Sequence, residues 1–119
     1  MKHILIIGCG SIGFRHFESL LQIKKKIKIT VIDNSNISLS KIKNKVKSSL
    51  KKNISINYSQ KINKFFGKID LAIISTNADV RKKIIFNLLK KNSVRNIILE
   101  KIAFQNMKDF YKVENSLRK

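Results

Sequence analysis

Short apolar runs alternate along the chain with segments in which apolar residues recur every three or four positions. Runs rich in Ile, Val and Leu predict five strands, at residues 3–7, 27–32, 54–58, 69–75 and 96–99. Apolar residues at helical spacing predict four helices, at residues 11–23, 38–50, 79–90 and 106–117. Residues 61–66 are expected to form a short helix or turn that ends at Gly67. Asn106, with Asp109 three residues later, is a variant of the capping box that opens a helix.

This alternation predicts an α/β fold, a Rossmann-type doubly wound parallel sheet with helices on both faces. Because crossovers between parallel strands are right-handed, the expected strand order is 3-2-1-4-5. The run at residues 3–7 begins with His3 and is otherwise apolar. Such a run is typical of a strand buried on both faces. The 119 residues amount to one domain, spanning 1–119.

The first strand is followed by a glycine-rich turn that carries the clearest chemical signal. Residues 8–13 read G-C-G-S-I-G, a complete G-x-G-x-x-G between a predicted strand and a predicted helix. Gly8 permits the tight turn, Gly10 lets the backbone approach a pyrophosphate, and Gly13 lets the helix pack close to the sheet. The N–H groups around Ser11 and Ile12, together with the helix dipole, are predicted to bind phosphate groups. The alternative is a glycine-rich turn that binds no ligand.

An acidic residue follows the second strand. Asp33 lies 20 residues after Gly13, where a carboxylate bonds the hydroxyls of an adenosine ribose and repels a 2′-phosphate. Residues 34–36 are Asn-Ser-Asn and offer no arginine to hold such a phosphate. The sequence therefore favours NAD over NADP as the cofactor. The alternative reading of Asp33 is a turn former that starts the loop.

The chain is strongly basic, with 26 Lys and Arg against 7 Asp and Glu and a formal net charge of +19. Only four of the basic residues are arginine, the residue that reads base edges and phosphates through two parallel bonds. The lysines form short runs near the ends of apolar segments, where solvated side chains are expected. We therefore expect weak, salt-sensitive binding to polyanions and no specific binding to nucleic acid.

Few other classes of site are supported. One cysteine excludes a disulfide framework and a cysteine-rich zinc site, and two histidines with seven acids give no credible metal cluster. No apolar run approaches the roughly 18 residues of a transmembrane helix, and the run at residues 4–7 is too short for a signal peptide. The expectation is a cytoplasmic protein without a bound metal or a membrane partner.

Four stretches occur in an order that resembles one enzyme family. They are residues 6–16 (IIGCGSIGFRH), 31–33 (VID), 69–77 (IDLAIISTN) and 98–101 (ILEK). Together they resemble the N-terminal domain of the Gfo/Idh/MocA oxidoreductase family. Members use a nicotinamide dinucleotide to oxidise or reduce sugars, nucleotide sugars, inositols and related polyols.

The resemblance implies a role for each matching residue. The implied cofactor-binding residues are Gly8, Gly10, Ser11, Ile12, Gly13, Asp33, Ser75, Thr76, Asn77 and Glu100. Within this set, Glu100 would lie near the nicotinamide ribose. Lys101 would be the catalytic residue, facing the substrate and helping to move its proton. Ile102 stands where the family usually has proline after the lysine, so the turn that directs Lys101 toward the substrate is expected to differ. Asn77 is a second departure, because it stands where proline usually follows the threonine.

Members of the family normally continue into a second domain, which supplies the substrate pocket. That domain is absent from this chain, so we expect cofactor binding with little turnover, and a sugar-like substrate only when a second domain is present. Two alternatives stay open: a nucleotide-sensing regulatory module, which would form stable dimers or larger assemblies, and a basic nucleic-acid-binding protein. The sequence leaves the oligomeric state undetermined.

Overall fold

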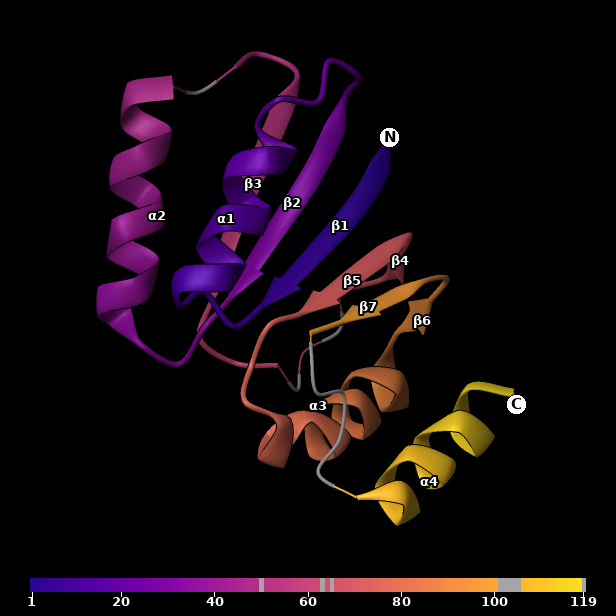
Figure 1. Ribbon diagram of the computed structural model, residues 1–119. Helices are drawn as coiled ribbons and strands as arrows, with labels where there is room; N and C mark the ends of the chain where they lie inside the picture. Colours follow the sequence, from indigo (N-terminus) through magenta and orange to yellow (C-terminus); the bar gives the residue numbers. More distant parts are fainter. Residues whose placement is uncertain (50, 63, 65, 101–105, 119) are drawn as a thin grey trace.

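The computed structural model describes residues 1–119 except 50, 63, 65, 101–105 and 119. Strands and helices alternate along the described chain (Figure 1). In order they are β1 (Lys2–Ile7), α1 (Ser11–Leu20), β2 (Ile27–Ile32), α2 (Asn36–Ser49), β3 (Ile54–Ser59), β4 (Lys68–Ile69), β5 (Leu71–Ile74), α3 (Ala78–Lys91), β6 (Ser93–Val94), β7 (Ile97–Leu99) and α4 (Met107–Arg118).

The central sheet is parallel throughout and has the order β3-β2-β1-β5-β7. This confirms the predicted 3-2-1-4-5 order, because β5 and β7 are the predicted fourth and fifth strands. The register aligns Ile4 of β1 with Ile29 of β2 on one side and Leu71 of β5 on the other. The chain leaves β3 at one edge and re-enters beside β1 as β5. The neighbouring ends of β1 and β5 are therefore the topological switch point, where open α/β sheets bind ligands.

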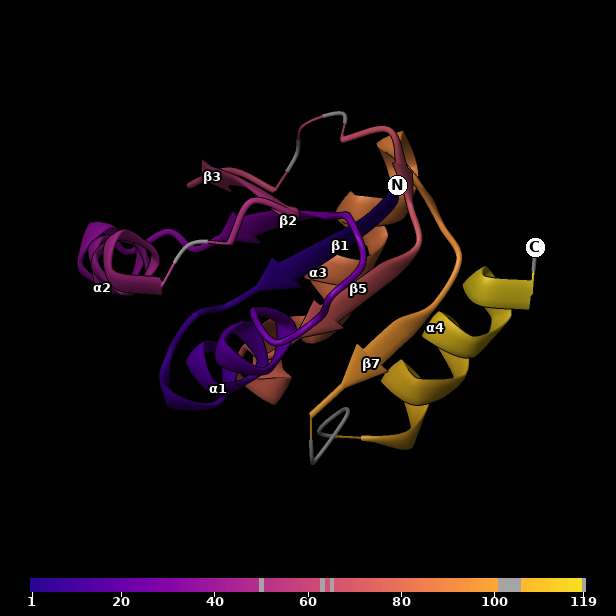
Figure 2. The same cartoon turned by 90° about the horizontal axis from the view of Figure 1, so that it is seen from above.

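Helices cover both faces of the sheet, as predicted. Figure 2 shows α1 and α2 on one side and α3 on the other. Phe17 of α1 and Ile42 of α2 are fully buried in one core cluster, and Leu88 of α3 and Val113 of α4 belong to the other. Burying each such side chain stabilises the fold by about 1.5–3 kcal/mol, so packing on two faces accounts for most of the stability.

The predicted fourth strand, residues 69–75, is divided at Asp70. The N–H of Asp70 donates to the carbonyl of His3 (2.9 Å), and its Oδ2 accepts from the N–H of His3 (2.9 Å). This exchange satisfies the backbone locally and separates β5 from the short β4, which pairs with β6 in a two-stranded ladder. The sequence pattern did not reveal this division, because it depends on a contact between residues 67 positions apart.

The element ends differ modestly from the predictions. Among the described residues of 61–66 none is helical, and Gly67 has a positive φ of 83°. The helix expected over 11–23 ends at Leu20, where Gln22 and Ile23 continue in tighter i to i+3 turns. At the start of α4, Asn106 Oδ1 accepts from the N–H of Asp109 (2.8 Å), which confirms the predicted cap. None of the described helices has the length and apolar character that crossing a membrane requires.

Candidate functional site

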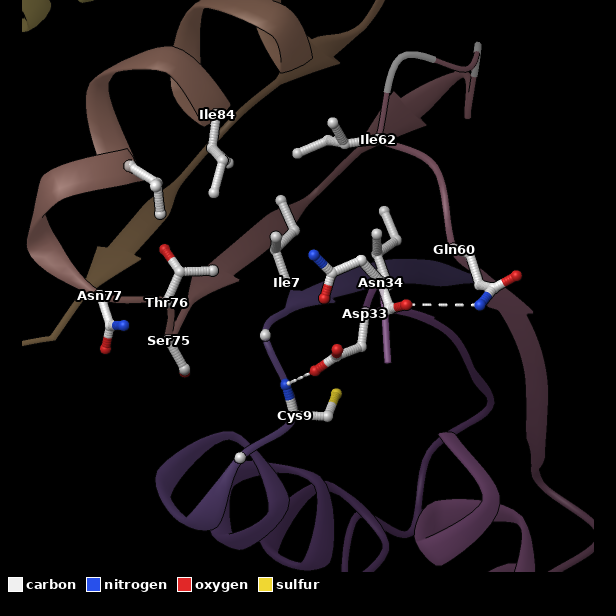
Figure 3. Close-up of a pocket in the computed structure, with 14 residues that line it drawn as sticks. Ile7, Cys9, Asp33, Asn34, Gln60, Ile62, Ser75, Thr76, Asn77 and Ile84 are labelled. Atoms are coloured by element: carbon white, nitrogen blue, oxygen red, sulfur yellow. Dashed lines mark hydrogen bonds between the residues drawn. The ribbon is translucent and has the colours of Figure 1, made fainter. Parts of the chain in front are cut away.

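A cleft of about 540 Å³ opens at the carboxyl ends of β1, β2 and β5, at the switch point of the sheet (Figure 3). Six of the predicted site residues line it, and they come from three separate loops: Gly8, Gly10, Asp33, Ser75, Thr76 and Asn77. The fold therefore brings together residues that are up to 69 positions apart in the sequence. Ser11 and Ile12 are exposed at the start of α1, beside this group.

The glycines of the first turn have three different environments. Gly8 has a φ of 89°, and an added Cβ would lie 2.9 Å from Thr76 Cγ2, so a side chain is excluded on both grounds. A Cβ on Gly13 would lie 1.9 Å from the carbonyl oxygen of Gly8, so this glycine lets α1 pack directly on the turn. A Cβ on Gly10 would meet no atom within 4 Å. Gly10 thus leaves open space next to the N-terminus of α1, where unpaired N–H groups favour an anion.

The Asp33 carboxylate is held at the end of β2 by two backbone donors. Its Oδ2 accepts from the N–H of Cys9 (2.6 Å) and its Oδ1 from the N–H of Ser35 (2.8 Å), the first of which is drawn in Figure 3. Each carboxylate oxygen can accept more than one hydrogen bond, so both oxygens can still accept a bond from a ligand in the cleft. The contact with Cys9 also couples Asp33 to the glycine-rich turn, and the two predicted halves of the site form one unit.

Two hydroxyl groups are buried at the end of β5. Ser75 Oγ and Thr76 Oγ1 have no hydrogen-bond partner among the described residues. A buried hydroxyl without a bond is costly, so such groups mark a place where a ligand or an ordered water completes the site. Asn77 follows as the N-cap of α3, with an extended backbone and no capping bond from its own side chain.

The cleft also contains residues that sequence reasoning missed. Gln60, just after β3, donates from Nε2 to Asn36 Oδ1 (2.8 Å) and more weakly to the carbonyl of Asn34 (3.4 Å). Ile62 and Ile84 add apolar surface opposite Asp33 (Figure 3). The available signal was positional, because Gln60 follows the carboxyl end of a parallel strand, as Asp33 and Ser75 do. Ile62 and Ile84 gave no such signal, because apolar residues at these positions are typical of an ordinary core.

Glu100 follows β7 and does not line the cleft in this structure; its carboxylate is bonded instead to His16. His16 Nε2 donates to Glu100 Oε1, and both side chains are about one quarter to one third exposed. The carbonyl oxygen of Glu100 accepts from Arg81, which also donates twice to the carbonyl of Thr76. The predicted catalytic residue, Lys101, lies outside the described residues, as does Ile102.

Two further titratable groups are structural. Burial, with the nearby Asp33 carboxylate, raises the pKa of the Cys9 thiol to about 12, so the thiol stays protonated near neutral pH. Burial and then Lys28 lower the pKa of His3, whose Nε2 is bonded to Thr30 Oγ1 (2.8 Å) on the neighbouring strand. Within the described part of the chain, no three His, Cys, Asp or Glu side chains lie close enough together to hold a metal ion.

Comparison with known protein families gave a match over almost the whole chain. The family model GFO_IDH_MocA, described as "Oxidoreductase family, NAD-binding Rossmann fold", matches residues 2–117. A search of curated protein sequences gave no match.

Solved structures with the same fold include an NAD-binding protein from Listeria innocua, with a TM-score of 0.73, 15% identity and 98% of this chain covered. A myo-inositol 2-dehydrogenase from Lactobacillus plantarum has a TM-score of 0.73 and 16% identity, again over 98% of this chain. A dimethyladenosine transferase from Plasmodium falciparum also aligns, over 85% of this chain, with a TM-score of 0.61 and 20% identity. At these identities the structural likeness shows the fold alone.

The chain spans about a third of the length of these solved structures, since it covers 32% of the first, 33% of the second and 36% of the third.

Proposed function

The chain belongs to the Gfo/Idh/MocA oxidoreductase family, and on that premise we propose that it is the NAD(H)-binding domain of an enzyme that transfers hydride to or from a sugar, nucleotide sugar or polyol. The family match confirms the resemblance predicted from four short stretches of sequence. The observation that carries the proposal is the cleft at the switch point, which is lined by the glycine-rich turn, by Asp33 and by Ser75 and Thr76, whose hydroxyls have no partner in the described part of the chain.

Each part of a dinucleotide has a matching part of the cleft. The pyrophosphate lies against Gly8 and Gly10 and takes N–H groups from the first turn of α1, at Ser11, Ile12 and Gly13. The adenosine lies on the β2 side, with its ribose hydroxyls on Asp33. Gln60 and Ile62 border the same side and contact the adenine end.

The nicotinamide end then lies on the other side of the switch point. The loop after β5, with Ser75, Thr76 and Asn77, lines that half, and Glu100 follows the next strand. The unpartnered hydroxyls of Ser75 and Thr76 supply hydrogen bonds to this half of the cofactor. The bound nicotinamide supplies the hydride chemistry, while the protein positions it and excludes competing reactions.

We assign NAD rather than NADP on the charge at the ribose end. A 2′-phosphate would approach the Asp33 carboxylate, which lines the cleft and already accepts two backbone bonds, so two anionic groups would face each other. The next three residues, 34–36, contain no cation to offset the repulsion.

The substrate half of the enzyme comes from outside the described residues. Hydride transfer needs a substrate held against the nicotinamide, and the present cleft provides the cofactor side of that arrangement. A second domain supplies the substrate contacts, Lys101 moves the substrate proton, and residues 1–119 act as the cofactor-binding unit with little turnover by themselves.

Calorimetric titration with NADH tests the proposal, at about 150 mM salt so that the net charge of +19 does not produce non-specific binding. We expect saturable binding at one site per chain. Asp33→Ala removes hydrogen bonds to a charged acceptor and should weaken NADH binding about 10- to 100-fold. Glu114→Ala on α4 is the matched control, because it removes the same charge from a half-exposed position that does not line the cleft.

Asp33→Asn separates the effect of charge from that of shape, and it should narrow the preference for NADH over NADPH. Absence of saturable NADH binding to the folded wild-type chain would refute the proposal. If Asp33→Ala and Glu114→Ala both bind NADH as tightly as wild type or slightly more tightly, binding follows overall charge and not this site.

A further inference from the structure

Arg81 is a buried cation in an unfavourable position. Its residue is only 3% exposed, and it lies in the first turn of α3, where the helix dipole repels positive charge. Burial lowers the pKa of its guanidinium, and the negative charge of Glu100 acts in the opposite direction. A charge is retained in such a place only when its partners offset the cost of removing it from water.

The described partners of Arg81 include two main-chain carbonyls on different strand ends. Nε and Nη2 both donate to the carbonyl of Thr76, at 3.1 and 2.9 Å, and Nη1 donates to the carbonyl of Glu100. Thr76 follows β5 and Glu100 follows β7, and these strands are neighbours in the sheet. The planar guanidinium has donors pointing in fixed, different directions, so one side chain sets the spacing of the two loops.

Glu100 is held from the opposite side as well. Its carboxylate accepts from His16 of α1, which follows the glycine-rich turn. A continuous set of contacts therefore runs from α1 through Glu100 and Arg81 to the loop after β5. Both the main chain and the side chain of Glu100 are fixed, by two different elements.

This set of contacts lies on one side of the switch point. Asp33 follows β2, and β1 and β5 separate it from Glu100 after β7. Neighbouring strands are about 4.8 Å apart, so the two carboxylates follow strands roughly 14 Å apart, a separation that an extended dinucleotide spans. When the adenosine ribose binds Asp33, the loops after β5 and β7 face the nicotinamide half of the cofactor.

We infer that Arg81 and His16 are positioning residues that hold Thr76 and Glu100 in place for the nicotinamide half of the cofactor. The inference rests on the proposed function, because it assumes that the cleft binds a dinucleotide. It goes beyond that proposal in assigning two residues, neither of which lines the cleft, to one half of the ligand.

Comparing two ligands tests the assignment. NADH contains both halves, whereas ADP lacks the nicotinamide and its ribose and keeps the adenosine and the pyrophosphate. We expect Arg81→Lys, which keeps the charge but cannot hold both carbonyls at once, to weaken NADH binding at least about fivefold while ADP affinity stays within about twofold. His16→Ala should act in the same direction, and alanine suits its helical position. Arg95→Lys is the matched control, since Arg95 is exposed at the other end of β7.

Each outcome decides the inference. A selective loss of NADH affinity in both variants, absent from Arg95→Lys, supports it. If Arg81→Lys fails to fold, His16→Ala alone decides, because its side chain is partly exposed. Equal loss for both ligands, or no loss for either, overturns the inference and leaves the proposed function standing. If the wild-type chain binds neither ligand, the proposed function and the inference fail together.

Discussion

Gly10 and Gly13 belong to one turn, yet an added methyl group would meet opposite surroundings. In Gly13→Ala the new Cβ would lie 1.9 Å from the carbonyl oxygen of Gly8, so α1 must move away from the turn by about 1 Å or more. In Gly10→Ala the new Cβ would meet nothing within 4 Å, and the φ of −67° is one that alanine adopts readily. Gly13 serves packing and Gly10 serves ligand approach, so the two variants should fail in different ways.

The magnitudes follow from these contacts. Forcing α1 off the turn in Gly13→Ala should cost about 3 kcal/mol, which lowers Tm by about 12 °C in a domain of this size. Gly8→Ala combines a φ of 89° with contacts of 2.9–3.0 Å and should cost about 2–4 kcal/mol. In Gly10→Ala, alanine is a weaker N-cap than glycine, which lowers stability, but it also makes the unfolded chain less flexible, which raises stability. These two effects nearly cancel, so the free energy of unfolding should change by less than about 1 kcal/mol. Its methyl group occupies the space proposed for the pyrophosphate, and NADH affinity should fall at least about tenfold.

Two measurements on the three variants separate these roles. Thermal unfolding followed by circular dichroism gives stability, and calorimetric titration with NADH gives affinity. Gly10→Ala should unfold near the wild-type temperature and bind poorly. A Gly13→Ala variant that unfolds within about 2 °C of wild type would refute the packing argument. A Gly10→Ala variant that binds NADH as tightly as wild type would refute the assignment of the open space to a phosphate.

Three further predictions concern other parts of the molecule. Because the pKa of Cys9 is raised to about 12 and the residue is 2% exposed, a thiol reagent at about pH 8 should modify it only as fast as the protein unfolds; rapid labelling of the native chain would contradict this. The hydrogen bond from Lys82 holds the pKa of Asp109 below its usual range, so this carboxylate contributes stability above about pH 4 that is lost as the pH falls through its folded value. Between about pH 5 and pH 3, the Tm of Asp109→Asn should therefore fall by less than the Tm of the wild type. An equal fall in Tm for both proteins would argue against the ion pair. Phe17→Ala empties a fully buried position and should cost about 3–5 kcal/mol in a urea titration; a cost below about 1 kcal/mol would show that the core collapses around it.

The features that could be predicted from sequence depend on short stretches of chain. Continuous apolar runs identified β1 and β2, and the alternation of strands with amphipathic helices gave the order of the sheet through the handedness of crossovers. The spacing from Gly8 to Gly13 and the position of Asp33 after β2 placed the two halves of the site at one edge. The structure then showed a direct hydrogen bond between them, from Cys9 to Asp33.

The features that were missed depend on contacts between distant residues. Arg81 falls within the helix predicted at residues 79–90, and the bonds to carbonyls at two strand ends that accompany its burial could not be predicted from that pattern. The break at Asp70 depends on pairing with His3 across the sheet. The contribution of Gln60 and Ile62 to the cleft depends on the path of the crossover after β3, which no periodicity encodes.

The central claim is that a dinucleotide binds at the carboxyl edge of the sheet, between Asp33 and the loop after β5. A titration of the isotopically labelled chain with NADH, followed by amide chemical shifts, tests where it binds. We expect saturable shifts at residues 9–13, 33–35 and 75–77, with little change at the opposite end of the sheet. That end has a second cleft lined by Lys2, Lys25, Lys26 and Lys68, where non-specific attraction of an anion would appear. Shifts confined to those lysines, or no saturable shifts at all, would contradict the account.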